Sequence, residues 1–357
     1  TTLFRSIWML LVGPITNGGE VVPKRMNMDM LRFGLRFLGA ILSTAWSRLG
    51  RGPARPSWSF LFEATVLAMR RTGRFMSRLD PLEQRRAWRA IAQPNALAAE
   101  IRVQAVKADT VPARWIIPVG VGDDAPVIVY FHGGSYRYGS FESHAELVSR
   151  LGKAAAARVL FVEYRLAPPD RFPAAVDDAV AALRWLGRAQ PLSRIVVSGD
   201  SAGGALALAA LIALRDAGEP LPRAALLICP WVDVSARNGS LSENAQWDWA
   251  LPADFIDWAA GYADEAAWQD PRVSPSYANL AGLPPLLIQV GGAEMLLDQV
   301  RAFALKAEAA GVAVRLTVEP DMIHNWQLLA SISTVAARSI AEAGAFVREQ
   351  VPVPLVA

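Results

Sequence analysis

The sequence predicts an α/β domain in which helices cover both faces of a mostly parallel sheet of eight strands. From about residue 101, short β-branched runs alternate with alanine-rich segments of helix length. Most of these runs are apolar throughout, as strands buried on both faces of a parallel sheet are. With 53% apolar and 19% charged residues, the chain can bury enough carbon to offset the entropy lost on folding.

The two earliest runs alternate in polarity and are candidates for an antiparallel edge, whereas helices separate most of the later ones. The expected strands are 101–106, 114–117, 127–131, 159–164, 195–198, 224–229, 286–290 and 312–318. The expected helices between the later strands include 173–189, 202–217 and 299–310.

The segment before residue 101 is predicted to be helical. Apolar residues recur there at spacings of three and four, with Arg32 and Arg36 on another face. A break rich in glycine and proline follows at 50–56, then a helix over 59–71 and another that begins after Asp80. We expect the first helix to pack on the body through its apolar face, with contact to lipid as the alternative. The apolar positions are Leu31, Leu35, Leu38, Leu42 and Ala45, and Phe33, Phe37 and Ile41 widen the apolar face.

Charge is divided unevenly along the chain. Residues 1–100 hold 15 Lys and Arg against 6 Asp and Glu, a net charge of +9, whereas residues 101–357 hold 21 against 27, a net charge of −6. The basic residues are scattered rather than clustered, so we expect no nucleic-acid partner. No apolar run is long enough to span a bilayer. The single cysteine, Cys229, excludes an internal disulfide and fits a reducing compartment, so we expect a cytoplasmic protein, with peripheral membrane association as the alternative.

A serine stands where an expected strand meets an expected helix. Gly199, Ser201 and Gly203 form the pattern G-x-S-x-G directly after the strand 195–198. On such a sharp turn the serine backbone is strained, small neighbours prevent collisions, and the hydroxyl is lifted clear of the sheet. Ser201 is therefore the predicted nucleophile. The N–H of Ala202 begins the following helix and is a predicted donor to an oxyanion.

A serine hydroxyl needs a base to take its proton, and the chain has three histidines. His324 follows the last expected strand, at the same carboxyl edge of the sheet as Ser201, which makes it the predicted base. His144 falls within an expected helix. His132 opens a loop after the strand 127–131.

That loop reads His132-Gly133-Gly134-Ser135. Two consecutive glycines allow backbone N–H groups to turn toward a ligand, so Gly133 and Gly134 are predicted to form the oxyanion hole together with Ala202.

The third catalytic residue should be a carboxylate that orients the imidazole. The chain order serine, acid, histidine places it after the strand 286–290. Glu294 comes first, on the loop itself, and Asp298 should lie about one turn into the following helix. We prefer Glu294, and expect Asp298 to be a capping or surface charge.

Taken together, these segments resemble the hormone-sensitive-lipase-like branch of the α/β-hydrolases, the bacterial esterases with an HGGG-type loop. The resemblance covers about residues 80–350, and two residues depart from the usual pattern: Ser135 in place of a third glycine and Glu294 in place of aspartate. The matching segments are His132-Gly133-Gly134-Ser135, Tyr164-Arg165-Leu166-Ala167-Pro168, Phe172-Pro173-Ala174-Ala175, Gly199 to Gly204, Pro230-Trp231-Val232-Asp233, Ser274-Pro275 and Met322-Ile323-His324.

The resemblance implies an α/β-hydrolase fold with an N-terminal helical cap over residues 1–80, of which the first 25 or so match nothing in the family. The catalytic domain would then cover 81–357, with an inserted cap segment at about 232–283 that holds Trp247, Trp249, Trp258 and Trp268. Arg165 and Asp178 would form a structural ion pair.

The implied activity is hydrolysis of short- to medium-chain carboxylic esters, a small-molecule substrate, through an acyl-serine intermediate and without metal or cofactor. Three alternatives stay open at this point: an interfacial lipase, a lactone or amide hydrolase that uses the same triad, and a ligand-binding protein that has kept the fold but lost turnover. The sequence also leaves a homodimer open.

Overall fold

Eight strands form one sheet in the order β10-β9-β8-β7-β5-β6-β4-β3. Strands β3 and β4 run antiparallel to each other, β4 runs antiparallel to β6, and all other neighbours in this sheet are parallel. The sequence predicted all eight strands and the antiparallel edge, with strand ends that differ by at most three residues. The strands are β3 (Ile101–Ala108), β4 (Val111–Pro118), β5 (Val127–Phe131), β6 (Arg158–Val162), β7 (Ile195–Asp200), β8 (Ala224–Ile228), β9 (Leu286–Gly291) and β10 (Val314–Glu319).

This computed structural model describes residues 16–17, 20–21, 28–92, 97–237, 239–248 and 257–352. Predictions for Trp249 and for most of the first 25 residues lie outside these ranges. Two-residue strands β1 (Thr16–Asn17) and β2 (Glu20–Val21) pair antiparallel near the start of the chain.

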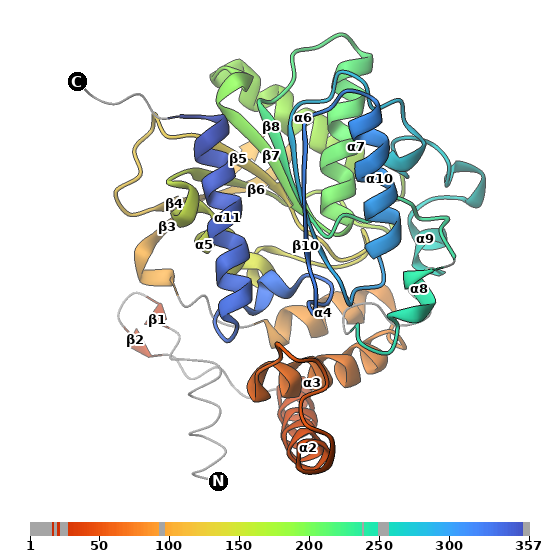
Figure 1. Cartoon of the computed structure of the whole chain (residues 1–357). Helices are drawn as coiled ribbons and strands as arrows, with labels where there is room; N and C mark the ends of the chain where they lie inside the picture. The colour runs from red at the N-terminus through yellow and green to blue at the C-terminus, as the bar shows by residue number, and fades with distance from the viewer. Residues whose placement is uncertain are drawn as a thin grey trace.

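Two helical layers enclose the sheet (Figure 1). The side chains of α5 and α11 pack with one set of strand residues, and those of α6, α7 and α10 pack with the other set, so that each sheet face has its own apolar core. The helices of these layers are α5 (Phe141–Ala155), α6 (Ala174–Ala189), α7 (Ala202–Asp216), α10 (Leu297–Ala309) and α11 (Thr334–Gln350).

The segment between β8 and β9 contains short helices and no strand among its described residues. Its helices are α8 (Ser240–Glu243), α9 (Asp257–Tyr262), η3 (Glu265–Ala267) and η4 (Pro275–Tyr277). Trp258 is buried against Tyr138 of the loop after β5, with the rings edge to face at 5.8 Å. The division of the chain into cap and catalytic domains stays a prediction. Short 3₁₀ turns elsewhere are η1 (Ala98–Glu100), η2 (Leu192–Arg194) and η5 (Trp326–Leu329).

Three helices, α2 (Met28–Arg51), α3 (Phe60–Met76) and α4 (Pro81–Ile91), lie beyond one edge of the sheet (Figure 1). The connection between α2 and α3 is anchored there, because Trp58 Nε1 donates to the carbonyl of Asp321 at 2.8 Å. Arg85 of α4 donates to the carbonyls of Arg137 and Ala167 at 2.7 and 2.9 Å. These contacts place the helices over the loops that follow β5, β6 and β10, at the carboxyl edge of the sheet.

The predicted packing face of α2 is wrong for its leucines and right for Phe37. Leu35, Leu38 and Leu42 are 57%, 42% and 63% exposed, whereas Phe37 and Ala40 are buried against α3. Both faces of this helix are apolar, so hydrophobic periodicity alone does not distinguish them. The face with small side chains packs, because alanine lets the two helices approach closely. None of the helices that the structure describes is both long and apolar enough to cross a bilayer.

Candidate active site

Ser201 occupies a strained turn between β7 and α7. Its φ of 54° and ψ of −120° are rare for a residue with a side chain. The small neighbours are required sterically, because a Cβ on Gly199 would lie 2.3 Å from the carbonyl oxygen of Gly203, and one on Gly203 would lie 2.0 Å from that of Phe131. The turn is fixed by a hydrogen bond from the N–H of Ser201 to the carbonyl of Ile228 at 2.8 Å. The local geometry is the one that the sequence pattern predicts.

Glu294 and His324 are brought together from the loops after β9 and β10. His324 Nδ1 lies 3.2 Å from Glu294 Oε1, and both residues are buried. The other carboxylate oxygen accepts the N–H of Gly291 at 2.7 Å, so the longer glutamate side chain folds back onto the end of its own strand. Nδ1 thereby faces the carboxylate, and Nε2 is the nitrogen that would take a proton from a serine.

A hydrogen bond joins the loop that holds Ser201 to the loop that holds His324. Asn325 follows His324, and its side-chain amide donates to Oδ2 of Asp200, which precedes Ser201, at 2.7 Å. Asn325 adopts a left-handed φ of 53° that turns it into this contact. Ser201 and His324 therefore lie at the same carboxyl edge, as the chain order predicts.

The surroundings of His324 favour its charged form. Burial alone lowers the pKa of this imidazole, but the hydrogen bond and negative charge of Glu294, with further contributions from Asp248 and Asp200, outweigh burial and raise the pKa above its usual value of 6.5. An ion pair with Glu294 is thus available when His324 takes up a proton, which is the state that follows proton abstraction from a serine.

Asp298, the other candidate for the acid, contacts Ser240. Its Oδ2 accepts the N–H of Ser240 at 2.8 Å, and its own N–H donates to the Ser240 hydroxyl at 3.0 Å. The carboxylate thereby caps the short helix α8, which matches the capping role expected for it. Only Glu294 of the two candidates is bonded to His324.

The predicted oxyanion donors need one correction. The N–H of Gly133 donates to Oδ1 of Asp200 at 2.8 Å, so it is used to hold its own loop and is not directed at a ligand. Within the described parts of the chain, the N–H groups of Gly134, Ser135 and Ala202 form no backbone hydrogen bond. The left-handed φ of 53° at Ser135 explains why glycine is usual at this position.

The other two histidines, His132 and His144, pack against aromatic rings and Asp200. His132 stacks on Tyr164 at 4.5 Å, and burial followed by the nearby His144 lowers its pKa to about 4, so the ring is neutral at pH 7. His144 Nε2 lies 3.3 Å from Oδ1 of Asp200. The ion pair that the family resemblance implies is also present, with Arg165 and Asp178 2.7 Å apart.

Two buried carboxylates close to Glu294 and His324 carry no sequence signal that predicts them. Asp200 bonds with Tyr130 in addition to Gly133, His144 and Asn325. Burial alone raises the pKa of Asp200, but these partners, His144 first, outweigh it and lower the pKa. Asp200 is the first x of the pattern G-x-S-x-G, a position at which the pattern specifies no residue type. Its partners come from distant parts of the chain, so only the fold identifies them.

Asp248 is the second of these carboxylates, and it accepts the N–H of Met295 at 2.9 Å. It comes from the inserted segment between β8 and β9, and it lies outside the motifs of that segment.

Cys229, Glu294 and His324 place donor atoms within 4.8 Å of one another, a spacing that a metal ion would accept. The chemistry of this set does not fit a metal well. Burial and the adjacent Glu294 raise the pKa of the Cys229 thiol well above its usual value, whereas a metal binds the thiolate. Both oxygens of Glu294 also accept hydrogen bonds already.

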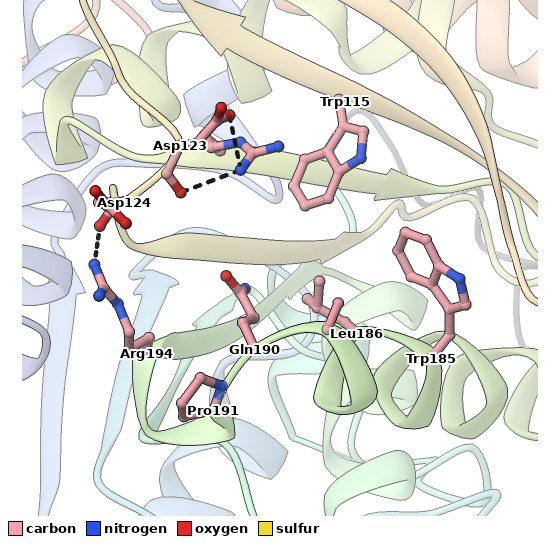
Figure 2. Close-up of a pocket in the computed structure, with 10 residues that line it drawn as sticks. Trp115, Asp123, Asp124, Trp185, Leu186, Gln190, Pro191 and Arg194 are labelled. Carbon is pink, nitrogen blue, oxygen red and sulfur yellow. Dashed lines mark hydrogen bonds and ion pairs between the residues drawn. The ribbon is translucent and has the colours of Figure 1, made fainter.

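A pocket of about 370 Å³ lies at the opposite edge of the sheet, at the amino ends of β5, β6 and β7. Figure 2 shows Trp115 and Trp185 along it, with Asp123 and Asp124 near one end. Arg158 pairs with Asp123 at 3.3 Å and lies over the Trp115 ring at 4.4 Å. Parallel α/β sheets bind ligands at their carboxyl edge, and this pocket holds no Ser–His pair, so we assign it to packing of the 119–126 loop.

Comparisons with known proteins show the family of this chain. A family model described as the alpha/beta hydrolase fold matches residues 128–328. An acetyl-hydrolase from Streptomyces hygroscopicus is 44% identical over 238 residues, which are 66% of this chain and 79% of that protein. The carboxylesterase NlhH of Mycobacterium tuberculosis is 35% identical over 277 residues, which are 73% of this chain and 86% of that protein.

Solved structures lead to the same family. An esterase from the bacterial hormone-sensitive lipase family superposes with a TM-score of 0.76 at 43% identity and covers 80% of this chain and 97% of that one. A hormone-sensitive lipase from a metagenome library superposes with a TM-score of 0.74 at 33% identity and covers 79% and 98%. This chain therefore belongs to the α/β-hydrolase family, in the branch that resembles hormone-sensitive lipase.

Proposed function

We propose that this chain hydrolyses carboxylic esters through an acyl-enzyme on Ser201, with His324 as general base and Glu294 as the acid that orients it. The observation that carries this proposal is the hydrogen bond between Glu294 and His324 at the sheet edge where the strained turn presents Ser201. The relatives named acetyl-hydrolase and carboxylesterase support an ester as the substrate class.

In the first half of the reaction, Ser201 Oγ attacks the ester carbonyl carbon while His324 Nε2 takes the hydroxyl proton. The carbonyl π electrons move to oxygen, and the imidazolium is stabilised by Glu294. When the tetrahedral intermediate collapses, the bond to the alcohol oxygen breaks and His324 gives its proton to the departing alkoxide. A water molecule then repeats these steps on the acyl-enzyme and releases the acid.

For the oxyanion hole we propose the N–H groups of Gly134 and Ala202, with the N–H of Ser135 as the neighbouring donor of the same loop. Gly133 is replaced in this role because its N–H is bonded to Asp200. Ala202 begins α7, so the positive end of the helix dipole adds to its N–H. Losing one such donor costs about 3 kcal/mol of barrier in related chemistry.

We propose short- to medium-chain acyl groups as substrates and a cytoplasmic location. A ligand-binding protein without turnover is disfavoured, because the base and its carboxylate partner are both in place. Lactones and amides use the same triad.

The decisive experiment is covalent labelling of the full chain with a fluorophosphonate, followed by peptide mass analysis. We expect a single adduct on Ser201, together with hydrolysis of nitrophenyl esters from acetate to decanoate that declines at the longer chains. Labelling at another residue, or hydrolysis that survives in the labelled protein, would overturn the assignment of Ser201. Peak activity on long acyl chains would overturn the chain-length proposal alone.

A further inference from the structure

The outer face of α2 carries a continuous row of exposed apolar side chains, here called the outward stripe. The exposed fractions range from 42% at Leu38 to 85% at Leu49, and Trp46 is 80% exposed. The spacing of three and four residues keeps the members on one side of the helix. The outward stripe consists of Leu35, Leu38, Leu42, Trp46 and Leu49.

The outward stripe lies outside the apolar cluster that joins α2 to α3. Among residues 32–51 of α2, the buried side chains are those of Phe37, Ala40 and Thr44, and Phe37 and Ala40 pack with Ala68 of α3. A helix of a soluble protein normally shows solvent a polar surface on the side away from its neighbour. A row of five large apolar side chains on that side, in a helix already packed through another face, indicates a binding surface.

The charge around the outward stripe identifies its partner. Residues 28–92 contain twelve arginines and four carboxylates, a net charge of +8. Six of these arginines are exposed, against two exposed carboxylates between residues 32 and 92. Arg32 and Arg36 both lie over the Phe75 ring of α3, at 5.8 and 4.3 Å, along one flank of the row. An apolar row flanked by cations is complementary to an anionic lipid surface.

A second copy of the chain fits this face less well. A symmetric contact through α2 would bring two segments of charge +8 against each other, and like charges at close range oppose association. An anionic bilayer instead accepts the leucines and Trp46 at its interface and neutralises the arginines.

The helix pair is also linked to the loop of the catalytic histidine. The N–H of Ser57 donates to Oδ2 of Asp321 at 3.0 Å, and Trp58 Nε1 donates to the carbonyl of the same residue at 2.8 Å. Asp321 precedes His324 by three residues. A surface that binds α2 is therefore attached, through one short connection, to the loops around the proposed site.

We propose that the outward stripe docks this chain on anionic lipid bilayers, with the carboxyl edge of the sheet held near the lipid surface. The leucines and Trp46 enter the interfacial layer, and the arginines of α2 and α3 contact the headgroups. Docking is a property of α2 and requires no turnover, so it is separable from the proposed esterase activity.

The test is sedimentation of the full chain with sucrose-loaded vesicles of phosphatidylcholine and phosphatidylglycerol at a ratio of about three to one. The phosphatidylglycerol gives these vesicles a negative surface potential, as anionic lipids give natural membranes. We expect the chain to bind these vesicles, and to bind vesicles of pure phosphatidylcholine at least about tenfold more weakly. Binding to the anionic vesicles should fall with added salt, because salt screens the attraction between the arginines and the headgroups. The double variant Leu42→Gln, Leu49→Gln should bind anionic vesicles with an affinity about tenfold lower than that of the unmodified chain.

A matched control changes two residues of the α/β body that are similarly exposed, Val119→Gln and Leu305→Gln, at 77% and 66%. It should bind as the unmodified chain does, and both variants should keep the same melting temperature because they replace solvent-exposed side chains. Failure of the unmodified chain to bind anionic vesicles, or equal loss in the two double variants, would overturn the proposal. A concentration-dependent dimer that Leu42→Gln, Leu49→Gln dissociates would assign the face to a second copy instead.

Discussion

The two edges of the central sheet differ in backbone strain and in buried charge. At the carboxyl edge, Ser135, Tyr136, Ser201, Cys229 and Asn325 all have left-handed φ angles between 45° and 58°. At the amino edge, Ala156 has one too, but there it ends a helix, which is an ordinary use of this conformation.

Charge follows the same division. The carboxylates of Asp200, Asp248 and Glu294 are buried at the carboxyl edge. At the amino edge, the side chain of Asp123 is 90% exposed beside its partner Arg158. Strained backbone and buried charge both reduce stability unless many contacts hold them. Both are concentrated at the carboxyl edge, which is where the proposed active site lies. The contrast between the two edges leads to five predictions.

The largest effect should follow loss of the nucleophile. Ser201→Ala should reduce kcat for nitrophenyl acetate by about 10⁵-fold or more, because no other group replaces the attacking oxygen. Ser193→Ala makes the same chemical change at the amino edge and should leave kcat within about twofold. A similar loss in both variants would show that the two edges do not differ in the way proposed here.

Glu294→Gln should lower kcat by about 10²- to 10⁴-fold, since the amide no longer stabilises the imidazolium of His324. It should also move the acid limb of the kcat/KM profile to lower pH, because the partner that raises the pKa of His324 is gone. Asp298→Asn is the matched control, and it should lower the melting temperature with little effect on kcat. Reversal of the two outcomes would identify Asp298 as the catalytic acid.

Asp200→Asn should reduce kcat by about 10²-fold, because small displacements of catalytic loops have effects of this size. An amide at this position either turns an N–H toward the donor of Gly133 or faces the amide of Asn325 with another donor. KM should change much less than kcat, a split that stopped-flow acylation can measure. Asp123→Asn, with the same change at the amino edge, should leave both constants unaltered.

The pH dependence should show a smaller effect. His324 must be neutral to accept the serine proton, and its pKa is raised above 6.5, so kcat/KM should fall by about tenfold per pH unit below an acid limb that lies above pH 6.5. An acid limb below pH 6 would mean that burial prevails over Glu294 at this histidine.

The smallest effect is expected at the amino edge. Arg158→Gln removes the ion pair with Asp123 and the contact with the Trp115 ring, and should cost about 1 kcal/mol of the free energy of unfolding. Urea denaturation measures this loss, and kcat should stay within about twofold. A strong fall in kcat would connect this edge to the chemistry.

Much of this arrangement was predictable from local sequence. Most of the eight strands are apolar runs, and the first two alternate in polarity. Glycines flank Ser201 at the two positions where a Cβ would collide with Gly203 or Phe131. Glu294 was predicted ahead of Asp298 because it lies on the loop itself, and the structure bonds it to His324.

Other features depend on partners that are distant in sequence. Nothing near Gly133 indicates that its N–H is taken by Asp200, 67 residues away. Asp248 carries no pattern that connects it to Met295.

The sequence by itself determined which residues form strands, which turn is strained and in what order serine, acid and histidine follow, because these depend on periodicity and on steric limits within a few residues. Only the tertiary structure decided which face of α2 packs and which N–H groups of the oxyanion loop are left for a ligand. Those choices rest on close approach and on competition for hydrogen bonds between segments far apart in the chain, which no local pattern encodes.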